Sequence, residues 1–224
     1  MSISENLNHI KASLPNHVTL VAVSKTKPVS DVMEAYQAGQ RIFGENKIQE
    51  MVEKHEALPK DIEWHMIGHV QRNKVKYMAS FVSLIHGVDN FKLLEEINKQ
   101  AKKNNRVINC LLQIKIAAED SKFGMSAIEA QKILSSEEFT RLTNIHVTGV
   151  MGMATFTNNN DQVKMEFQNL KNIFDSLKSY QTANFSPKII SMGMSGDYPL
   201  AISCGSTMVR VGSSIFGARH YYHN

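Results

Sequence analysis

The chain has 224 residues, of which 42% are hydrophobic and 21% are charged, a balance that excludes an intrinsically disordered protein. Its two cysteines allow at most one disulfide bond, which favours a reducing compartment. No apolar run approaches the ~20 residues that cross a bilayer, and the polar N-terminus does not resemble a secretion signal. We therefore expect a cytoplasmic protein without a membrane segment.

The net charge of +4 is compatible with a nucleic-acid ligand, but the basic residues are dispersed along the chain. The densest group is Arg72, Lys74 and Lys76, and Tyr77 is its aromatic neighbour. We interpret this group as a solvated helix face and expect no nucleic-acid partner. A modest positive charge also suits a small phosphorylated ligand.

Short apolar runs and helical patterns alternate along the chain. Strands are predicted over residues 18–24, 41–43, 62–67, 81–85, 107–116, 145–150, 188–191 and 208–211. Helices are predicted over residues 30–38, 47–58, 71–79, 90–103, 127–135, 164–180 and 199–203, and an extra one over 5–14. Every strand except the last is thus followed by a helix.

This alternation indicates parallel strands joined by right-handed crossovers. Eight such units predict an α/β fold, a closed (β/α)8 TIM barrel that forms a single domain over residues 1–224 with an extra N-terminal helix. The alternative is an open doubly wound sheet, which normally has a glycine-rich turn after its first strand. Residues 24–30 contain no glycine, so the barrel is favoured.

In such a barrel, functional residues follow the C-terminal ends of the strands, and the last two loops often bind phosphate. Here these loops, 191–195 and 210–214, are rich in glycine and serine, although such residues are also common in ordinary loops. Lys25 directly follows the first predicted strand. By itself it could be a surface lysine, but beside a phosphate site a partly desolvated lysine is a nucleophile toward aldehydes. The combination predicts a site for pyridoxal phosphate.

Closure of the barrel would pair the last strand with the first and bring Arg210 close to Lys25. An arginine opposite the pyridine nitrogen can only donate a hydrogen bond, which makes the cofactor a weak electron sink. The alternative is a structural ion pair of Arg210 at the rim of the barrel.

Six motifs in this order along the chain resemble the signatures of the pyridoxal-phosphate homeostasis protein family. They are Ala22–Pro28, Phe43–Glu50, Trp64–Lys74, Glu119–Met125, Ser191–Asp197 and Gly205–Gly217. Members of that family are single barrels similar to the N-terminal domain of bacterial alanine racemase. The resemblance implies that Lys25 is the Schiff-base lysine and that Arg210 faces the pyridine nitrogen. Further residues are expected to line the pocket: Asn46, His65, Met192 and Met194.

The same resemblance assigns the cofactor's phosphate to the last two loops. Ser195, Gly212 and Ser213 would hold it, with Ser206 and Thr207 nearby. Ser121 and Lys122, after the fifth predicted strand, are further residues at this end of the barrel. No His or Cys pattern has the spacing of a metal site, so we expect no metal.

The resemblance implies a protein that stores or delivers pyridoxal phosphate in vitamin B6 homeostasis, with apo pyridoxal-phosphate enzymes as candidate recipients. The alternative is an amino-acid racemase on the same barrel, which would need a second base such as the tyrosine that a separate domain brings in alanine racemase. The sequence ends at Asn224, so we expect no such domain, and Tyr221 and Tyr222 lie in a tail. We therefore expect no enzymatic turnover, and a monomer or weak dimer.

Overall fold

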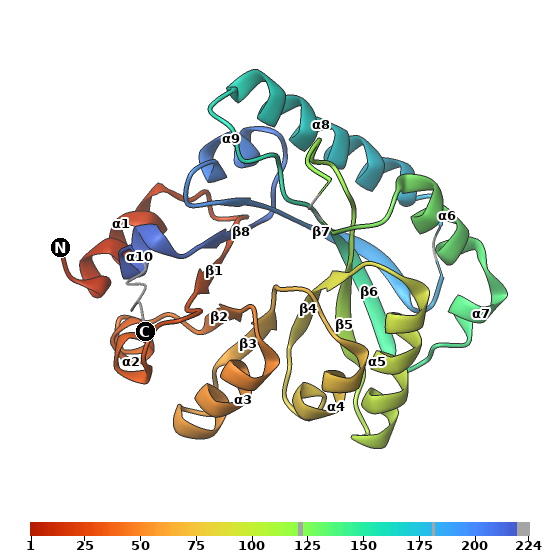
Figure 1. The fold of residues 1–224 in the computed structure, drawn as a ribbon, viewed down its shortest axis with the longest axis horizontal. Helices are drawn as coiled ribbons and strands as arrows, with labels where there is room; N and C mark the ends of the chain where they lie inside the picture. Colours follow the sequence, from red (N-terminus) through yellow and green to blue (C-terminus); the bar gives the residue numbers. More distant parts are fainter. Residues whose placement is uncertain (121–122, 181, 219–224) are drawn as a thin grey trace.

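The structure, a computed structural model, describes residues 1–120, 123–180 and 182–218. Its parallel strands form a closed barrel in the order β1-β2-β3-β4-β5-β6-β7-β8 (Figure 1). The strands are β1 (Thr19–Val23), β2 (Ile42–Glu45), β3 (Glu63–Met66), β4 (Leu84–Val88), β5 (Ile108–Gln113), β6 (Ile145–Met151), β7 (Phe185–Met194) and β8 (Met208–Val211). The predicted TIM-barrel fold is confirmed.

The helices surround the barrel, and α1 precedes the first strand as expected (Figure 1). They are α1 (Ile3–Ser13), α2 (Val29–Gln37), α3 (Ile48–Ala57), α4 (Val75–Met78), α5 (Phe91–Lys103), α6 (Ala127–Ser135), α7 (Glu137–Thr140), α8 (Asn160–Leu177), α9 (Tyr198–Ser203) and α10 (Ser213–Phe216), with a 3-10 turn η1 (Arg72–Lys74) before α4. Within the described ranges, no helix is long and apolar enough to cross a membrane.

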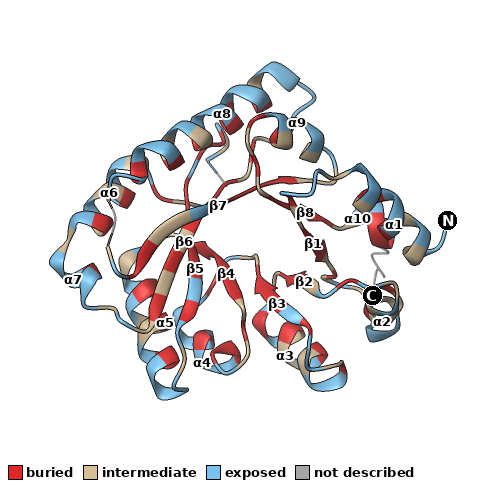
Figure 2. Ribbon diagram, turned by 180° about the vertical axis from the view of Figure 1, so that it is seen from behind, coloured by how far each residue is buried: buried red, intermediate tan, exposed pale blue. Residues whose placement is uncertain are grey.

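Side chains alternate between the two faces of each strand, so the barrel has two apolar layers, one inside it and one outside it. The inner layer fills the barrel and contains Val21, Leu84, Leu111, Met151 and Met208. The outer layer lies between the strands and the helices, and it contains large side chains such as Phe43, Trp64 and Phe167. Figure 2 shows the same arrangement: the helices are buried on their inner sides and exposed on their outer sides.

Strand β4 is displaced from its predicted position, because it begins at Leu84 and not at residue 81, and β7 extends three residues beyond its predicted range at each end. The amides of Phe81 and Val82 donate to the carbonyl of Met78, so these apolar residues close the end of helix α4. The strand consequently runs on to Val88, and His86 lies inside it instead of after it. The short helices α7 and α10 were not predicted, since four residues carry too little periodicity.

A bulge near the end of β7 changes the direction of the chain at the mouth of the barrel. The register with β8 shifts between Ser191 and Met194, which pairs with Arg210. Gly193 lies within this interval at φ +101, and a Cβ there would approach the Cβ of Ala201 to 2.7 Å. Only glycine fits both requirements, and such bulges re-aim the residues that follow them.

Candidate functional site

A cavity of about 590 Å³ opens at the C-terminal end of the barrel strands. This volume is in the usual range for small-molecule sites, and this end of the fold is where barrel enzymes bind their ligands. The cavity is lined by residues from the ends of most strands: Val23, Lys25, Asn46, Ile67, Gly68, His69, Gln113, Phe123, Met153, Phe156, Met194, Ser195, Gly196, Arg210, Gly212 and Ser213.

Most of the predicted site residues meet in this cavity. The group consists of Lys25, Asn46, Met194, Ser195, Arg210, Gly212 and Ser213. Lys25 and Arg210 come together because β1 pairs with β8, with Val21 opposite Arg210. One cavity therefore contains a lysine, a buried arginine and a glycine-serine loop.

His65 and Met192 lie elsewhere than expected. His65 lies in the middle of the barrel interior, below the mouth, and its Nδ1 is 2.9 Å from Nε2 of His86. Met192 is fully buried in the outer apolar layer. It follows Ser191, whose hydroxyl faces the interior, so alternation along β7 directs the methionine toward the helices.

Ser206 and Thr207 also lie away from the cavity. They precede β8, and loops that precede barrel strands lie at the end opposite the ligand site. The hydroxyl of Ser206 is 2.7 Å from the carbonyl oxygen of Met192, and that of Thr207 accepts from the amide of Ile190 at 2.9 Å. Both hydroxyls therefore tie β7 to the start of β8.

A chain of buried hydrogen bonds leads from the cavity into the barrel. Nη1 of Arg210 donates to the hydroxyl of Ser191 at 2.5 Å, and this hydroxyl is 2.9 Å from Nδ1 of His86. Arginine only donates, which leaves Ser191 free to give its own proton to His86. In that tautomer, Nε2 of His86 carries a proton and donates to Nδ1 of His65. The charge of Arg210 thus favours one direction along the chain.

Burial sets the charge of each member of this chain. It lowers the pKa of His65 to about 3 and that of His86 well below its ordinary value, so both rings are neutral. Burial also lowers the pKa of Arg210, to about 10, which leaves the guanidinium charged at neutral pH. Arg210 therefore presents a fixed positive charge and hydrogen-bond donors beside the cavity.

The last two loops bring several hydrogen-bonding groups to one point. The hydroxyl of Ser195 accepts from the amides of Gly212, at 3.2 Å, and Ser214, at 3.4 Å. Gly212 lies close to β1, since a Cβ there would be 3.1 Å from the carbonyl oxygen of Val23. Amides and hydroxyls converging in this way are typical of phosphate sites.

The sequence did not reveal an aromatic side of the cavity. The rings of His69 and Phe123 stack with centroids 4.1 Å apart, and Nε2 of Gln113 donates to the carbonyl of Phe123 at 3.2 Å. Gln113 is the last residue of β5, and a polar residue at a strand end can indicate a site residue. The predicted strand ran on to residue 116, so Gln113 was not recognised as its end. Ser121 and Lys122, expected near this position, lie outside the described residues.

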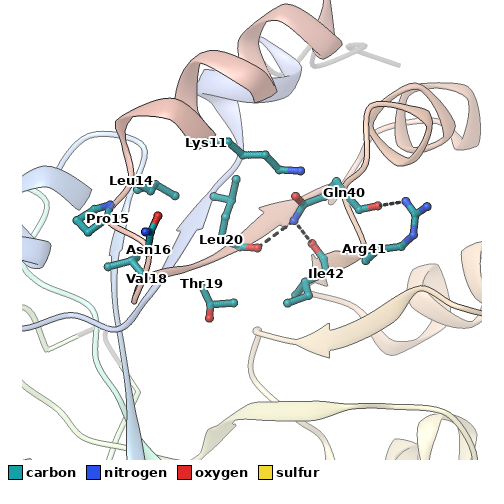
Figure 3. Close-up of a pocket in the computed structure, with 10 residues that line it drawn as sticks. All are labelled: Lys11, Leu14, Pro15, Asn16, Val18, Thr19, Leu20, Gln40, Arg41 and Ile42. Atoms are coloured by element: carbon teal, nitrogen blue, oxygen red, sulfur yellow. Dashed lines mark hydrogen bonds between the residues drawn. The ribbon is translucent and has the colours of Figure 1, made fainter.

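A second cavity, of about 330 Å³, lies at the opposite end of β1 and β2 (Figure 3). Lys11 and Arg41 line it, and Nε2 of Gln40 donates to the carbonyls of Leu20 and Ile42. These bonds satisfy a buried amide and connect the first two strands. The cavity contains no glycine-serine loop and lies away from the functional end of the barrel. In the parts of the chain that the structure describes, no cluster of metal ligands occurs.

Comparisons with known proteins agree with this geometry. The family model of the alanine racemase N-terminal domain matches residues 1–220. The chain is 38% identical over 235 residues to the pyridoxal phosphate homeostasis protein of Haemophilus influenzae, covering 99% of this chain and 98% of that protein. Its identity to the protein of that name from Vibrio alginolyticus is 40% over 237 residues, covering 98% and 99%. The chain belongs to the pyridoxal phosphate homeostasis protein family.

Solved structures support the same family. PipY of Synechococcus elongatus, solved without PLP, superposes with a TM-score of 0.90 at 32% identity, covering 96% of this chain and all of that one. The TM-score to PipY with PLP bound is 0.87. Alanine racemase from E. faecalis shares the fold, with a TM-score of 0.73 at 17% identity over 58% of that longer chain. The resemblance of the six motifs to this homeostasis family is thereby confirmed.

Proposed function

We propose that this member of the family binds pyridoxal phosphate in the cavity at the mouth of the barrel and delivers it to other proteins. One observation carries the proposal: Lys25, Arg210 and the Ser195–Gly212 contact line one cavity. PipY, a relative from the same family, binds PLP. Each chemical part of the cofactor has a suitable partner in this group of residues.

The residues fit the cofactor by their chemistry. Ser195, Gly212 and Ser213 offer hydroxyl and amide groups that suit a phosphate, and Arg210 offers donors that suit a pyridine nitrogen. Lys25 supplies the amine. When bound, pyridoxal phosphate supplies an aldehyde, whose carbon forms a double bond to an amine nitrogen while its oxygen leaves as water with both amine protons. Arg210 keeps its own proton because its pKa remains near 10.

We further propose that the protein does not turn over amino acids at an enzymatic rate. A hydrogen bond from Arg210 leaves the ring nitrogen unprotonated, so the ring withdraws electrons weakly. Racemisation would also need a second acid-base group near the amino acid. Among the described residues lining the cavity, His69 is the side chain that could serve, and its ring is stacked on Phe123 and lies 3.7 Å from Asp89. A racemase that uses His69 as its second acid-base group is therefore the second candidate function.

The test is to load the purified protein with pyridoxal phosphate, reduce it with borohydride and locate the adduct by peptide mass mapping. We expect the adduct on Lys25. Lys25→Ala should lose it and remain folded, while Lys47→Ala, which changes an exposed lysine near Asn46, should retain it. Pyridoxal without phosphate should bind much more weakly, because it cannot use the glycine-serine loop.

Delivery is measured in the same preparation. The loaded protein is mixed with an apo pyridoxal-phosphate enzyme, and the recovery of that enzyme's activity is timed against free cofactor at equal concentration. A reduced adduct on another lysine, or equal affinity for pyridoxal with and without phosphate, would refute the proposed site. Loaded protein that restores no activity would refute the delivery role and leave the binding site intact.

A further inference from the structure

A buried cluster of charged residues lies directly behind Lys25. Lys54 of helix α3 contacts Glu45 of β2 at 2.7 Å and Glu50 of its own helix at 2.8 Å. The side chains of Lys54 and Glu45 are 5% and 0% exposed, so both charges are almost fully removed from water. The hydroxyl of Ser24, the residue before Lys25, donates to the same Glu45 oxygen at 2.6 Å.

This cluster binds the backbone on both sides of Lys25. Nζ of Lys54 donates to the carbonyl of Ser24 at 2.7 Å, and Oε1 of Glu50 accepts from the amide of Thr26 at 2.6 Å. These two groups belong to the two peptide planes that adjoin the Cα of Lys25. The salt bridge between Lys54 and Glu50 connects them, so one ion pair restrains both planes, in addition to the turn bond from the amide of Lys27 to the carbonyl of Ser24 at 3.1 Å.

The donors of Lys54 are fully used by this arrangement. An ammonium group has three N–H donors, and here they reach Ser24, Glu45 and Glu50. Oε2 of Glu45, in contrast, is buried without a hydrogen-bond partner in the described structure. A buried charge cluster of this kind contributes little net stability, whereas it can impose one geometry.

The backbone at Thr26 indicates that a specific geometry is imposed. Its φ is +63, in the left-handed region that a β-branched residue seldom adopts. That conformation is strained for a residue with a Cβ and persists where the surroundings compel it. The hydrogen bond from the Thr26 amide to Glu50 is such a constraint.

We propose that Ser24, Glu45, Glu50 and Lys54 form a positioning clamp that directs the amine of Lys25 toward the aldehyde carbon of the ligand. The inference rests on the proposed function and deepens it, since it assigns a task to residues outside the cavity. Without the clamp, the turn keeps the bond from the amide of Lys27 to the carbonyl of Ser24, but both peptide planes lose their side-chain partners and Thr26 is less restrained in its left-handed conformation. The amine then spends less time where it can attack, and misplacement by about 1 Å can slow a reaction about 100-fold.

Glu50→Ala is the decisive variant, because the Glu50 side chain is 23% exposed and its loss should not prevent folding. Glu50→Gln retains an oxygen that accepts from the Thr26 amide. Glu53→Ala is the matched control, since Glu53 is exposed on the same helix. We follow covalent capture of pyridoxal phosphate by stopped-flow absorbance. Binding of 4-deoxypyridoxine phosphate, which has no aldehyde, is followed by calorimetry.

The clamp predicts that Glu50→Ala slows capture about tenfold or more while affinity for 4-deoxypyridoxine phosphate changes less than about twofold. Glu50→Gln should restore most of the rate, and Glu53→Ala should behave as wild type. A parallel loss of capture and non-covalent affinity would show a merely structural role and overturn the proposal. Unchanged capture in Glu50→Ala would overturn it as well.

A further measurement separates the clamp from the proposed function. Reductive methylation with formaldehyde and cyanoborohydride reports the reactivity of Lys25 relative to exposed Lys47 without any cofactor. If the wild type binds no pyridoxal phosphate but Glu50→Ala alters this ratio, the proposed function fails and the clamp stands. If the ratio is unchanged and capture is also unchanged, the clamp fails and the function stands.

Discussion

Arg210 donates a 2.5 Å hydrogen bond to Ser191, and the same hydroxyl lies 2.9 Å from His86. A single serine therefore connects a charge beside the cavity to a neutral ring inside the barrel. All three side chains are buried, so the loss of any bond leaves a polar group without water to replace it.

Ser191→Ala should lower the free energy of unfolding by roughly 1–3 kcal/mol, because Arg210 and His86 each lose a buried partner. It should also weaken retention of the cofactor, since Arg210 loses one of the bonds that orient it and keeps the bond from Nη2 to the carbonyl of Gly152. Ser186→Ala is the control: Ser186 lies on β7 like Ser191, at a partly exposed position, and its hydroxyl bonds to His146 of β6. Urea unfolding and cofactor titration measure the two effects. Equal losses in both variants would contradict a special role of the Arg210–Ser191 bond.

Ser195→Ala should weaken pyridoxal phosphate retention by roughly 1–2 kcal/mol, the cost of losing a hydrogen bond to a charged group. Ser213→Ala should have a similar effect. Ser203→Ala, an exposed serine whose hydroxyl bonds within helix α9, serves as control. The measurement is equilibrium dialysis with pyridoxal phosphate and with pyridoxal. An equal loss of affinity for both ligands would place the serines away from the phosphate.

Glu45 should make stability depend on pH. Burial raises its pKa from 4.5 to about 7, against the opposing effect of Lys54. The folded state thus holds this proton more tightly than the unfolded state, so the contribution is fully present below pH 4.5 and is lost as the pH rises through 7. The lost stability is at most on the order of 3 kcal/mol.

Glu45→Gln keeps an acceptor for Ser24 and Lys54 but cannot ionise. Relative to wild type, the variant should therefore gain stability as the pH rises from about 4.5 through 7. The melting temperatures of both proteins are measured across this range. The buried neutral histidines, His65 and His86, affect both proteins alike, so the difference between the two melting temperatures reports the effect of Glu45. Parallel melting curves would show that Glu45 does not titrate in this window.

Incubation of the loaded protein with L-alanine and other L-amino acids should yield no D-isomer, keto acid or amine at a typical enzymatic rate of about 1–1000 per second. The reason is the hydrogen-bond donor that we propose Arg210 brings to the ring nitrogen, together with the stacked position of His69. Chiral chromatography measures the products. Racemisation at about one turnover per second, abolished by both Lys25→Ala and His69→Gln, would establish the racemase instead.

Much of the fold could be predicted because strand and helix periods differ and alternate along the chain. The strand 208–211 and the helix 127–135 were placed with their observed bounds. Strand β4 was misplaced because apolar residues also close helix α4, and hydrophobicity alone does not separate the two roles. The β7 bulge at Gly193 depends on contact with Ala201, which no local pattern reveals.

For the site, the residues that directly follow strands were the easiest to predict. Lys25 and Asn46 line the cavity because each comes just after a strand end. His65 and Met192 were misplaced because two properties depend on the register of the whole barrel: how far a side chain lies below the mouth, and whether it points to the interior or to the helices. The clamp behind Lys25 was not predicted, since Lys54 looks like an ordinary helix lysine until α3 is placed against β2.

The pairing of β1 with β8 also has a consequence for synthesis of the protein. Lys25 leaves the ribosome early, whereas Arg210 and the loop at Gly212 are among the last parts of the barrel to emerge. A nascent chain therefore carries Lys25 without the groups that complete the proposed site until β8 and the loop at Gly212 have been synthesised. A product that stops before β8 would carry the amine of Lys25 without the residues proposed to retain the ligand.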